Sequence, residues 1–303
     1  MSEAQTAKTD IPRESWIDRA LPARALPYAR LMRLDRPIGT WLLLWPCWWS
    51  LALAGAGPFA WHIYVLFGLG AVVMRGAGCT YNDIIDRDID AKVARTATRP
   101  LPSGQVTRLQ AWMFLAAQLL IGLWILAQFN TFAIVVGVAS LGLVFSYPFM
   151  KRITYWPQAW LGLTFNWGAL LGWAVAKGEI GWPAVVLYVA GILWTLGYDT
   201  IYAHQDREDD ELIGVKSSAL ALGARTKPFV AVCYALALAL IGLAMTEAGW
   251  TFWSMACLVA AAAHGAWQVV TLDIDNAANC LTRFRSNRDF GALVMAALIL
   301  AQS

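Results

Sequence analysis

Long apolar stretches separated by short polar connections organise this sequence from residue 38 onward. A helix needs about 20 apolar residues to cross a bilayer, and eight stretches reach that length, with a shorter ninth near the C-terminus. These stretches are 38–57, 61–82, 109–128, 131–149, 156–176, 182–203, 228–247 and 250–271, with 290–302 as the ninth. Backbone groups in lipid must bond internally, and the stretches are too long for barrel strands, so the pattern predicts an all-α, polytopic membrane protein.

The connections between these spans are alternately rich and poor in basic residues. Nearly all of the 23 Lys and Arg residues lie before the first span or after an even-numbered one. Because Lys and Arg favour the cytoplasmic side, we expect residues 1–36 and every even-numbered connection to face the cytoplasm. Residues 37–303 are expected to form a single transmembrane domain with two related halves, about 37–150 and 151–303.

Composition agrees with a chain that lies in a lipid bilayer. Of the 303 residues, 59% are hydrophobic and 14% are charged, and the net charge is only +3. The basic residues flank spans, so membrane topology explains them and no nucleic-acid partner is expected. The first 36 residues lack the apolar core of a signal peptide, and their acidic residues argue against a transit peptide. Within them, ALPYARLMRLDRP is either a short helix on the membrane surface or a plain cytoplasmic lead-in.

An acidic segment, NDIIDRDID, directly follows the second span. If the helix continues through it, Asn82, Asp86 and Asp90 lie at i, i+4 and i+8 and share one face. Asp83 borders that face, whereas Asp88 points away from it. The segment therefore presents several oxygen ligands on one side of a helix end.

A second acidic segment, YDTIYAHQDREDDELIGVKSS, follows the sixth span. Asp206 and Asp210 again lie at i, i+4, and Tyr202 and Asp199 precede Asp206 by one and two turns. Both acidic segments follow even-numbered spans, so both are expected at the cytoplasmic side.

Stacked carboxylates repel one another, each close pair by a few kcal/mol at an effective dielectric constant of about 20. Mg²⁺ suits such hard oxygen ligands and takes one or two protein carboxylates together with water and substrate phosphate. The two segments thus predict a diphosphate site with bridging metal, near Arg95, Arg99, Lys151, Arg152 and Lys216. The candidate ligands are Asn82, Asp83, Asp86, Asp90, Asp206 and Asp210. The alternative is a solvated, charge-balanced loop at the membrane surface.

Two further features lie next to the first acidic segment. Arg75 lies inside the second span, seven residues before Asn82, and an arginine there usually faces a polar cavity. It could contact a diphosphate or a substrate carboxylate, or it could form a structural ion pair or reach the membrane surface. The segment RTATRPLPSG is either a lid over the site or an ordinary turn.

The acidic motifs resemble those of a known family. NDIIDRDID and DREDD are similar to the two motifs of UbiA-type intramembrane prenyltransferases, and the resemblance covers about residues 31–223. It implies about nine transmembrane helices around a central cavity with cytoplasmic lid loops. It also implies that Asn82, Asp86 and Asp90 hold one Mg²⁺ and that Asp206 and Asp210 hold another. Lys151 and Arg152 of YPFMKR would face the diphosphate.

Other segments resemble the branch of this family that acts in ubiquinone synthesis. RPLPSG and YDTIYAHQDREDDELIGVKSSA are similar to that branch, which implies polyprenyl diphosphate and 4-hydroxybenzoate as substrates. Asp86 and Asp206 are then expected to be catalytic through the metal, and Asp199 or the leaving diphosphate would accept the ring proton. A bacterial cell inner membrane is the expected location.

Two other functions would account for part of the same sequence pattern. Another aromatic acceptor, as in haem, menaquinone or chlorophyll synthesis, would use the same chemistry. A secondary transporter would use its acids to carry cations, but such sites usually lie near the bilayer midplane, whereas these acids lie at helix ends.

Overall fold

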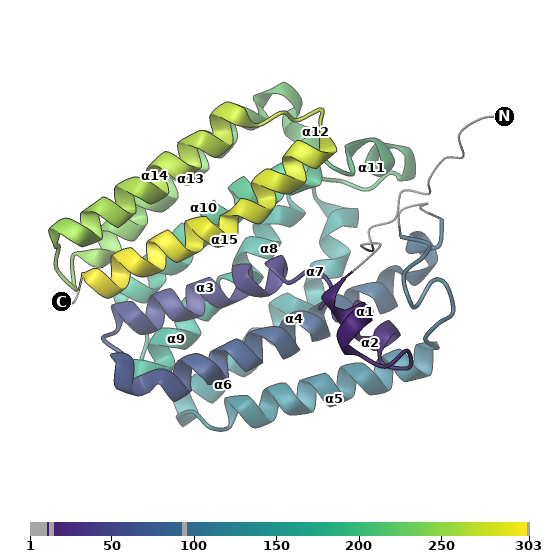
Figure 1. Ribbon diagram of the computed structural model, residues 1–303, viewed down its shortest axis with the longest axis horizontal. Helices are drawn as coiled ribbons and strands as arrows, with labels where there is room; N and C mark the ends of the chain where they lie inside the picture. Colours follow the sequence, from purple (N-terminus) through teal and green to yellow (C-terminus); the bar gives the residue numbers. More distant parts are fainter. Residues whose placement is uncertain (1–10, 12–14, 93–95, 302–303) are drawn as a thin grey trace. The chain divides into compact units, whose positions relative to one another are not determined.

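The apolar stretches are helices in this computed structural model, which describes residues 11, 15–92 and 96–301 (Figure 1). The helices of the first half are α1 (Trp16–Ala20), α2 (Leu26–Leu31), α3 (Ile38–Leu53), the 3₁₀ turn η1 (Pro58–Ala60), α4 (Trp61–Asp90), α5 (Arg108–Leu126), α6 (Thr131–Ala139) and α7 (Leu141–Ile153). Those of the second half are α8 (Pro157–Phe165), α9 (Trp167–Lys177), α10 (Trp182–Ala203), α11 (Arg207–Ile213), α12 (Ser218–Leu222), η2 (Gly223–Arg225), α13 (Thr226–Met245), α14 (Phe252–Thr271) and α15 (Ala277–Leu300). The described part of the chain holds no strand, which confirms the all-α prediction.

Several helices are long and apolar enough to cross a membrane. Within the described residues there are six such segments: Trp61–Asp90, Arg108–Leu126, Thr131–Ile153, Trp182–Ala203, Ser218–Met245 and Phe252–Thr271. The helix α3 is apolar but shorter, at 16 residues. The predicted ninth span is part of α15, whose 24 residues include several charges in its first half. The polytopic character is thus confirmed, while the count of about nine spans stays a prediction.

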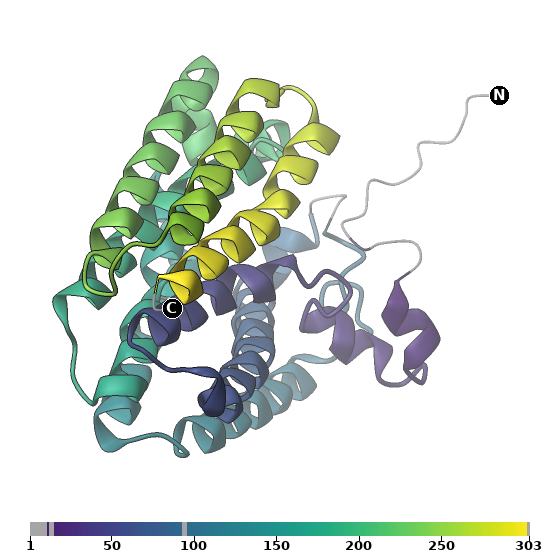
Figure 2. The same ribbon diagram turned by 60° about the vertical axis from the view of Figure 1, so that its left-hand side comes forward.

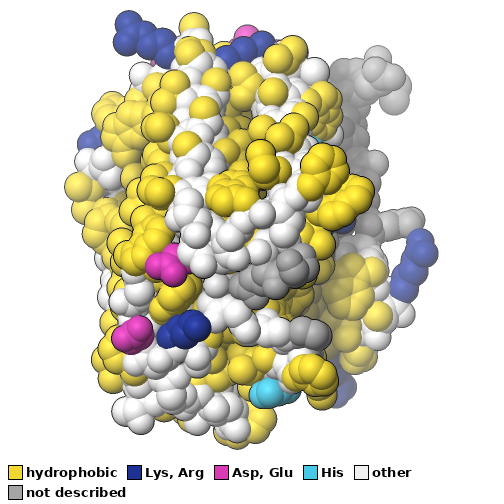
Figure 3. All heavy atoms as spheres, turned by 90° about the vertical axis from the view of Figure 1, so that its left-hand side faces the viewer, with side chains coloured by type: hydrophobic (Ala, Val, Ile, Leu, Met, Phe, Trp, Pro, Cys, Tyr) yellow, Lys and Arg dark blue, Asp and Glu magenta, His cyan; other side chains and the backbone are white. Residues whose placement is uncertain are grey.

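Exposed apolar side chains mark the surface that would meet lipid. Phe252, Trp253, Met255, Val259 and Val270 of α14 are all more than half exposed to solvent. Figure 3 shows hydrophobic side chains over much of one face, with Lys and Arg gathered at its upper edge. Such a surface is unfavourable in water and favourable in hydrocarbon.

The first of two compact units consists of residues 1–40 and 69–125. It holds the N-terminal helices, the second part of α4 and nearly all of α5. Its core includes Leu31, Ile84, Leu101 and Leu115, all buried. The N-terminal segment and the connection after α4 both contribute to this core, so they are tied to the acidic end of α4. The helix α2 confirms that the ALPYARLMRLDRP segment is helical in part.

The second unit consists of residues 41–68 and 126–303. There α10 packs against α8, α9, α13 and α15, and α14 packs against α13 and α15 (Figure 2). The side chains of Trp194 and Tyr198 on α10 are almost fully buried, and Trp194 Nε1 donates to Asn287 Oδ1 on α15 over 2.9 Å. The boundaries of the two units differ from the predicted halves 37–150 and 151–303, whose relation stays a prediction.

Two predicted spans are interrupted. The stretch 131–149 contains α6 and α7, which meet at Ser140, and 156–176 contains α8 and α9, which meet at Asn166. Asn166 is fully buried, and its Nδ2 donates to the Gly162 carbonyl and to Thr195 Oγ1, each over 2.8 Å. These two hydrogen bonds from the Asn166 side chain occur where the apolar stretch 156–176 is divided into α8 and α9.

Candidate functional site

The helix α4 carries the whole first acidic cluster, because it continues without a break to Asp90. Asp83 and Asp86 are fully buried and Asp90 is 6% exposed, whereas the Asp88 side chain is 78% exposed. The prediction that the helix continues and turns Asp88 away from the other acids is therefore confirmed. Three buried carboxylates at the end of one helix require compensation by positive charge or by hydrogen bonds.

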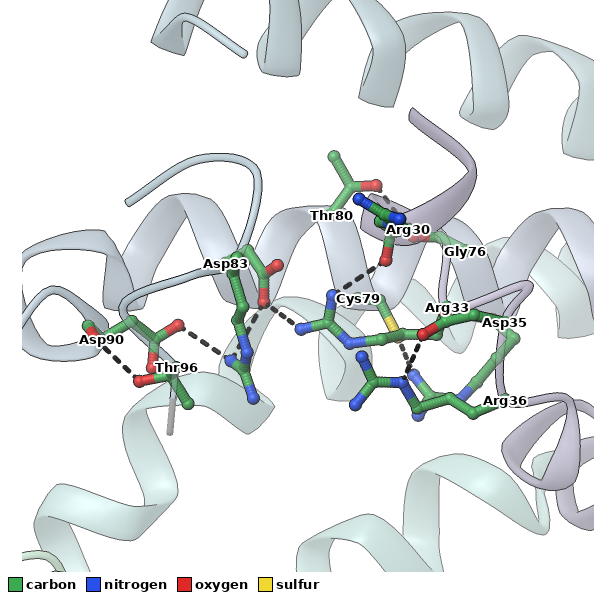
Figure 4. A network of polar contacts seen from close by, with 12 residues as sticks. Arg30, Arg33, Asp35, Arg36, Gly76, Cys79, Thr80, Asp83, Asp90 and Thr96 are labelled. Carbon is green, nitrogen blue, oxygen red and sulfur yellow. Dashed lines mark hydrogen bonds and ion pairs between the residues drawn. The ribbon is translucent and has the colours of Figure 1, made fainter. Parts of the chain in front are cut away.

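Two arginines provide compensation within the first unit. Arg33 Nη2 donates to Asp83 Oδ1 over 2.7 Å (Figure 4). Arg99 Nη1 contacts Asp90 Oδ2 at 2.9 Å and Asp83 Oδ1 at 3.4 Å. Both arginine side chains are nearly buried, with 10% and 12% exposed. The pairing agrees with the prediction that Arg99 lies at the acidic cluster, whereas Arg33 had no predicted role.

Sequence reasoning missed Arg33 for an identifiable reason. It lies 50 residues before Asp83, after the short helix α2. The available signal was the alternation of arginine and aspartate in RLMRLDRP, just before the first apolar stretch. In that segment Arg36 Nε also donates to Asp35 Oδ2 over 3.1 Å.

Arg75 lies one turn before Cys79 on α4 and packs against the start of α3. Its Nη1 donates to Cys79 Sγ. Gly39 permits this position, because a Cβ there would lie 2.4 Å from Arg75 Nε. The structure thus gives Arg75 a fixed place in the first unit. Its contact with a substrate stays a prediction.

The connection after α4 is partly anchored. Thr96 Oγ1 donates to the Asp90 carbonyl over 2.8 Å, and Leu101 and Val106 are buried in the core of the first unit. These contacts hold the described part of RTATRPLPSG in place, and its function as a lid stays a prediction. Arg95 lies outside the described residues.

The second acidic cluster is divided between two helices. We expected Asp199, Asp206 and Asp210 to lie along one helix, but α10 ends at Ala203 and α11 begins at Arg207. Asp206 occupies the N-cap position of α11, and its carbonyl accepts from the Asp210 N–H over 2.8 Å. The i, i+4 pair is therefore retained, while Asp199 lies on a separate element.

The predicted basic residues of the second unit come together at the end of α7. Lys151 and Arg152 lie in its last turn, where positive charge is favourable. The Lys216 N–H donates to the Lys151 carbonyl over 3.0 Å, and Lys216 Nζ donates to the Ile153 carbonyl over 3.1 Å. Nζ also lies 5.4 Å from the Tyr155 ring centroid. Lys216 therefore supports the helix end that carries the other two cations.

One histidine lies between the two helices of the second cluster. His204 is buried, and its Nε2 shares a hydrogen bond of 2.8 Å with Thr226 Oγ1. Burial, followed by the nearby Arg207 guanidinium, lowers the pKa of His204 to about 4. The ring is therefore neutral at neutral pH.

The first cluster fits a divalent cation by its chemistry. Asp83 Oδ2 is buried and has no hydrogen-bond partner among the described residues, although Oδ1 binds arginine. A buried, unsatisfied carboxylate oxygen is costly, and a metal ion would satisfy it. Among the described residues, no three His, Cys, Asp or Glu side chains gather closely enough to hold a metal by themselves. Mg²⁺ needs only one or two carboxylates when phosphate and water complete its shell, so the donor set fits magnesium with phosphate.

Comparison with known proteins gives a consistent result. The UbiA prenyltransferase family matches residues 43–293. The chain is similar to proteins named mitochondrial 4-hydroxybenzoate polyprenyltransferase, with 52% identity to that of Aedes aegypti, 51% to that of Arabidopsis thaliana and 50% to that of Homo sapiens. The alignments cover 90%, 95% and 92% of this chain. The chain spans 63%, 72% and 76% of these relatives' lengths.

Solved structures share the fold. A UbiA homolog from Aeropyrum pernix K1 superposes with a TM-score of 0.71 and 26% identity, covering 86% of this chain and 97% of that one. A UbiA homolog from Archaeoglobus fulgidus bound to GPP and Mg²⁺ superposes with a TM-score of 0.64 and 16% identity, covering 91% and 99%.

The relatives contradict the expectation of a bacterial cell inner membrane. They are named as mitochondrial proteins, and their sources are eukaryotes. The alternation of Lys and Arg, on which membrane sidedness was predicted, distinguishes two sides of a bilayer and does not identify the organelle.

Proposed function

The chain belongs to the UbiA prenyltransferase family, and we propose that it transfers a polyprenyl group from polyprenyl diphosphate to 4-hydroxybenzoate in ubiquinone biosynthesis. The new bond would form at the ring carbon ortho to the hydroxyl group. The observation that carries the proposal is the set of buried aspartates on α4, two of which, Asp83 and Asp90, pair with Arg33 and Arg99, in a chain about half identical to enzymes of that name. Such a cluster suits a metal diphosphate better than it suits a solvated surface loop.

The proposed metal ligands are oxygen atoms in each of the two acidic motifs. In the first motif they are Asn82, Asp83, Asp86 and Asp90, and in the second they are Asp206 and Asp210. When bound, Mg²⁺ neutralises the diphosphate and makes it a better leaving group. Asp86 and Asp206 are the ligands on which activity is expected to depend most.

The basic side chains would stabilise charge as the allylic C–O bond breaks. Negative charge then grows on the departing oxygen, and fixed cations directed at that oxygen favour the transition state over the ground state. The proposed contacts are Arg75, Arg99, Lys151 and Arg152. Lys216 would contribute in the same way or by holding the end of α7 through the Ile153 carbonyl.

A proton must leave the ring carbon after the new C–C bond forms. Asp199, partly exposed at the end of α10, is one proposed acceptor, and the departing diphosphate is the other. Neutral His204 is buried against Thr226 and receives no role in this step.

The proposal is tested with the purified full chain, Mg²⁺, 4-hydroxybenzoate and polyprenyl diphosphates of graded length. We expect prenylated hydroxybenzoate as the product, and we expect Asp86→Ala and Asp206→Ala each to lose at least about 100-fold in rate. Asp88→Ala is the matched control, because it removes the same charge from the same helix at an exposed position. EDTA is expected to stop the reaction and added Mg²⁺ to restore it.

Three results would contradict the proposal. Near-normal product formation by Asp86→Ala or Asp206→Ala at saturating Mg²⁺ would remove the metal site from the mechanism. Prenylation of a different aromatic acceptor, with 4-hydroxybenzoate left unchanged, would keep the chemistry and replace the substrate. Cation flux in liposomes without any prenylated product would favour transport instead.

A further inference from the structure

Arg33 has an unusual backbone conformation for a residue with a side chain. Its φ is 60°, and among the described residues it alone has a positive φ without being glycine. The left-handed region is sterically unfavourable for residues with a Cβ, and such strain persists only where surrounding contacts determine it. The contacts around Arg33 therefore indicate what the conformation achieves.

These contacts tie the N-terminal segment to the acidic helix. The Arg33 N–H and Nη1 both donate to the Arg30 carbonyl, each over 3.0 Å. Nη2 donates to Asp83 Oδ1 over 2.7 Å (Figure 4). The hydrogen bond to the Arg30 carbonyl orients the Arg33 guanidinium. The hydrogen bond to Asp83 connects the guanidinium to the acidic motif.

The result is an asymmetric Asp83 carboxylate. Oδ1 accepts from Arg33 and lies 3.4 Å from Arg99 Nη1, while Oδ2 is buried and meets no hydrogen-bond partner in the part of the chain that the structure describes. Arg99 also holds Asp90 at 2.9 Å. One oxygen of Asp83 thus accepts the bonds from arginine, and the other is buried with no described donor to satisfy it.

We propose that Arg33 is a positioning residue, which holds Asp83 so that Oδ2 can bind the metal that accompanies the diphosphate. This rests on the proposed function, which supplies the metal and the diphosphate. Carboxylates that bind metals are themselves held by hydrogen bonds, and loss of such a partner typically weakens metal affinity 10- to 100-fold. Arg33 acts through Asp83 and does not touch the reacting atoms.

A purely structural role for Arg33 makes a different prediction. In that case the ion pair would only attach the N-terminal segment to α4, and its loss would lower stability without a specific effect on metal. Glycine and alanine at this position separate the two roles, because glycine accepts a positive φ freely and alanine does not. We expect Arg33→Gly to melt at a higher temperature than Arg33→Ala, and both to lose metal affinity to the same extent.

The experiment measures Mg²⁺ binding apart from activity. The melting temperature of the detergent-purified full chain is followed as Mg²⁺ is added at a fixed concentration of inorganic pyrophosphate, and the midpoint of the shift gives the apparent affinity. We expect the midpoint to rise about 10- to 100-fold in Arg33→Gly and Arg33→Ala, and by less in Arg33→Lys, which keeps the charge. The matched control, Arg30→Gln, removes a guanidinium that pairs with Asp18 and keeps the carbonyl that Arg33 needs.

The outcomes distinguish this inference from the proposed function. If the wild-type chain responds to Mg²⁺ and both Arg33→Gly and Arg33→Ala respond with the same midpoint, the positioning role of Arg33 is overturned and the proposed function is not. An equal loss of Mg²⁺ affinity in Arg30→Gln would also overturn the positioning role, because the loss would then follow from removing any positive charge from the N-terminal segment. A wild-type chain that shows no Mg²⁺ response would overturn both proposals. If Arg33→Ala fails to fold, the strain-free Arg33→Gly variant decides the question.

Discussion

Gly39→Ala is expected to displace Arg75 without unfolding the protein. A Cβ at residue 39 would lie 2.4 Å from Arg75 Nε, 2.9 Å from Nη2 and 3.1 Å from Cζ. Ordinary contact begins near 3.4 Å, so Nε must retreat by about 1 Å. The obstructing atoms belong to the end of a flexible side chain and not to the backbone, so the helices can stay in place while the guanidinium moves away from Cys79.

The size of the expected effect rests on the proposed contact between Arg75 and the substrate. A misplacement of about 1 Å at a group that positions substrate can cost about 100-fold in rate, which corresponds to about 2.7 kcal/mol. We therefore expect kcat/KM for prenyl transfer to fall about 10- to 100-fold in Gly39→Ala, with a melting temperature close to that of the wild type.

The assay compares matched alanine substitutions and a double mutant. Gly78→Ala is the control, because it lies on the same helix as Arg75 and a Cβ there meets nothing within 4 Å. Its kcat/KM should stay within about twofold of wild type. If Gly39 acts through Arg75, the Gly39→Ala/Arg75→Gln double mutant should lose no more than Arg75→Gln alone, because contacting residues are not additive. Wild-type kcat/KM in Gly39→Ala, or additive losses in the double mutant, would refute this reasoning.

Three further predictions concern the second unit. Lys216→Met should lower the free energy of unfolding by about 1 kcal/mol, seen as a lower melting temperature, because the ammonium loses the Ile153 carbonyl. The pKa of His204 is about 4 in the folded chain, below its ordinary value of 6.5. As pH decreases from 6.5 to 4, the unfolded chain therefore binds a proton at this histidine before the folded chain does, and stability should fall. Melting curves should show a smaller fall in stability for His204→Asn over the same pH range. Asn287→Leu should reduce stability by about 1–2 kcal/mol in thermal melting, because Trp194 Nε1 loses its buried acceptor.

The end of α4 could be predicted from sequence because its geometry is local. Residues at i and i+4 on a helix share a face whatever surrounds them. Once α4 continues to its last residue, burial of Asp86 and Asp90 and exposure of Asp88 follow from the same periodicity. The apolar pattern likewise predicted most spans, since their burial in lipid depends on composition over about 20 residues.

Features decided by single hydrogen bonds could not be predicted in this way. The break at Asn166 comes with a hydrogen bond to Thr195, 29 residues away, and an average over an apolar window does not register such a bond. The second acidic segment is divided because α10 ends at Ala203 and α11 begins at Arg207. The i, i+4 spacing of its acids does not indicate that division. Arg33 depends on a tertiary contact with Asp83, 50 residues away, and the local pattern around each residue does not indicate that the two are partners.

The charges of the first cluster explain how buried acids can persist there and still bind a cation. Asp83, Asp86 and Asp90 carry three formal negative charges, and Arg33 and Arg99, which contact two of them, carry two positive ones. These five groups by themselves sum to one net negative charge, so the two arginines lower the cost of burying the acids without cancelling all of their charge. One divalent cation would reverse the sign of the set to +1, which then favours a diphosphate anion in the same place. Metal and diphosphate should thus bind more tightly together than either does alone, by a coupling that is reciprocal.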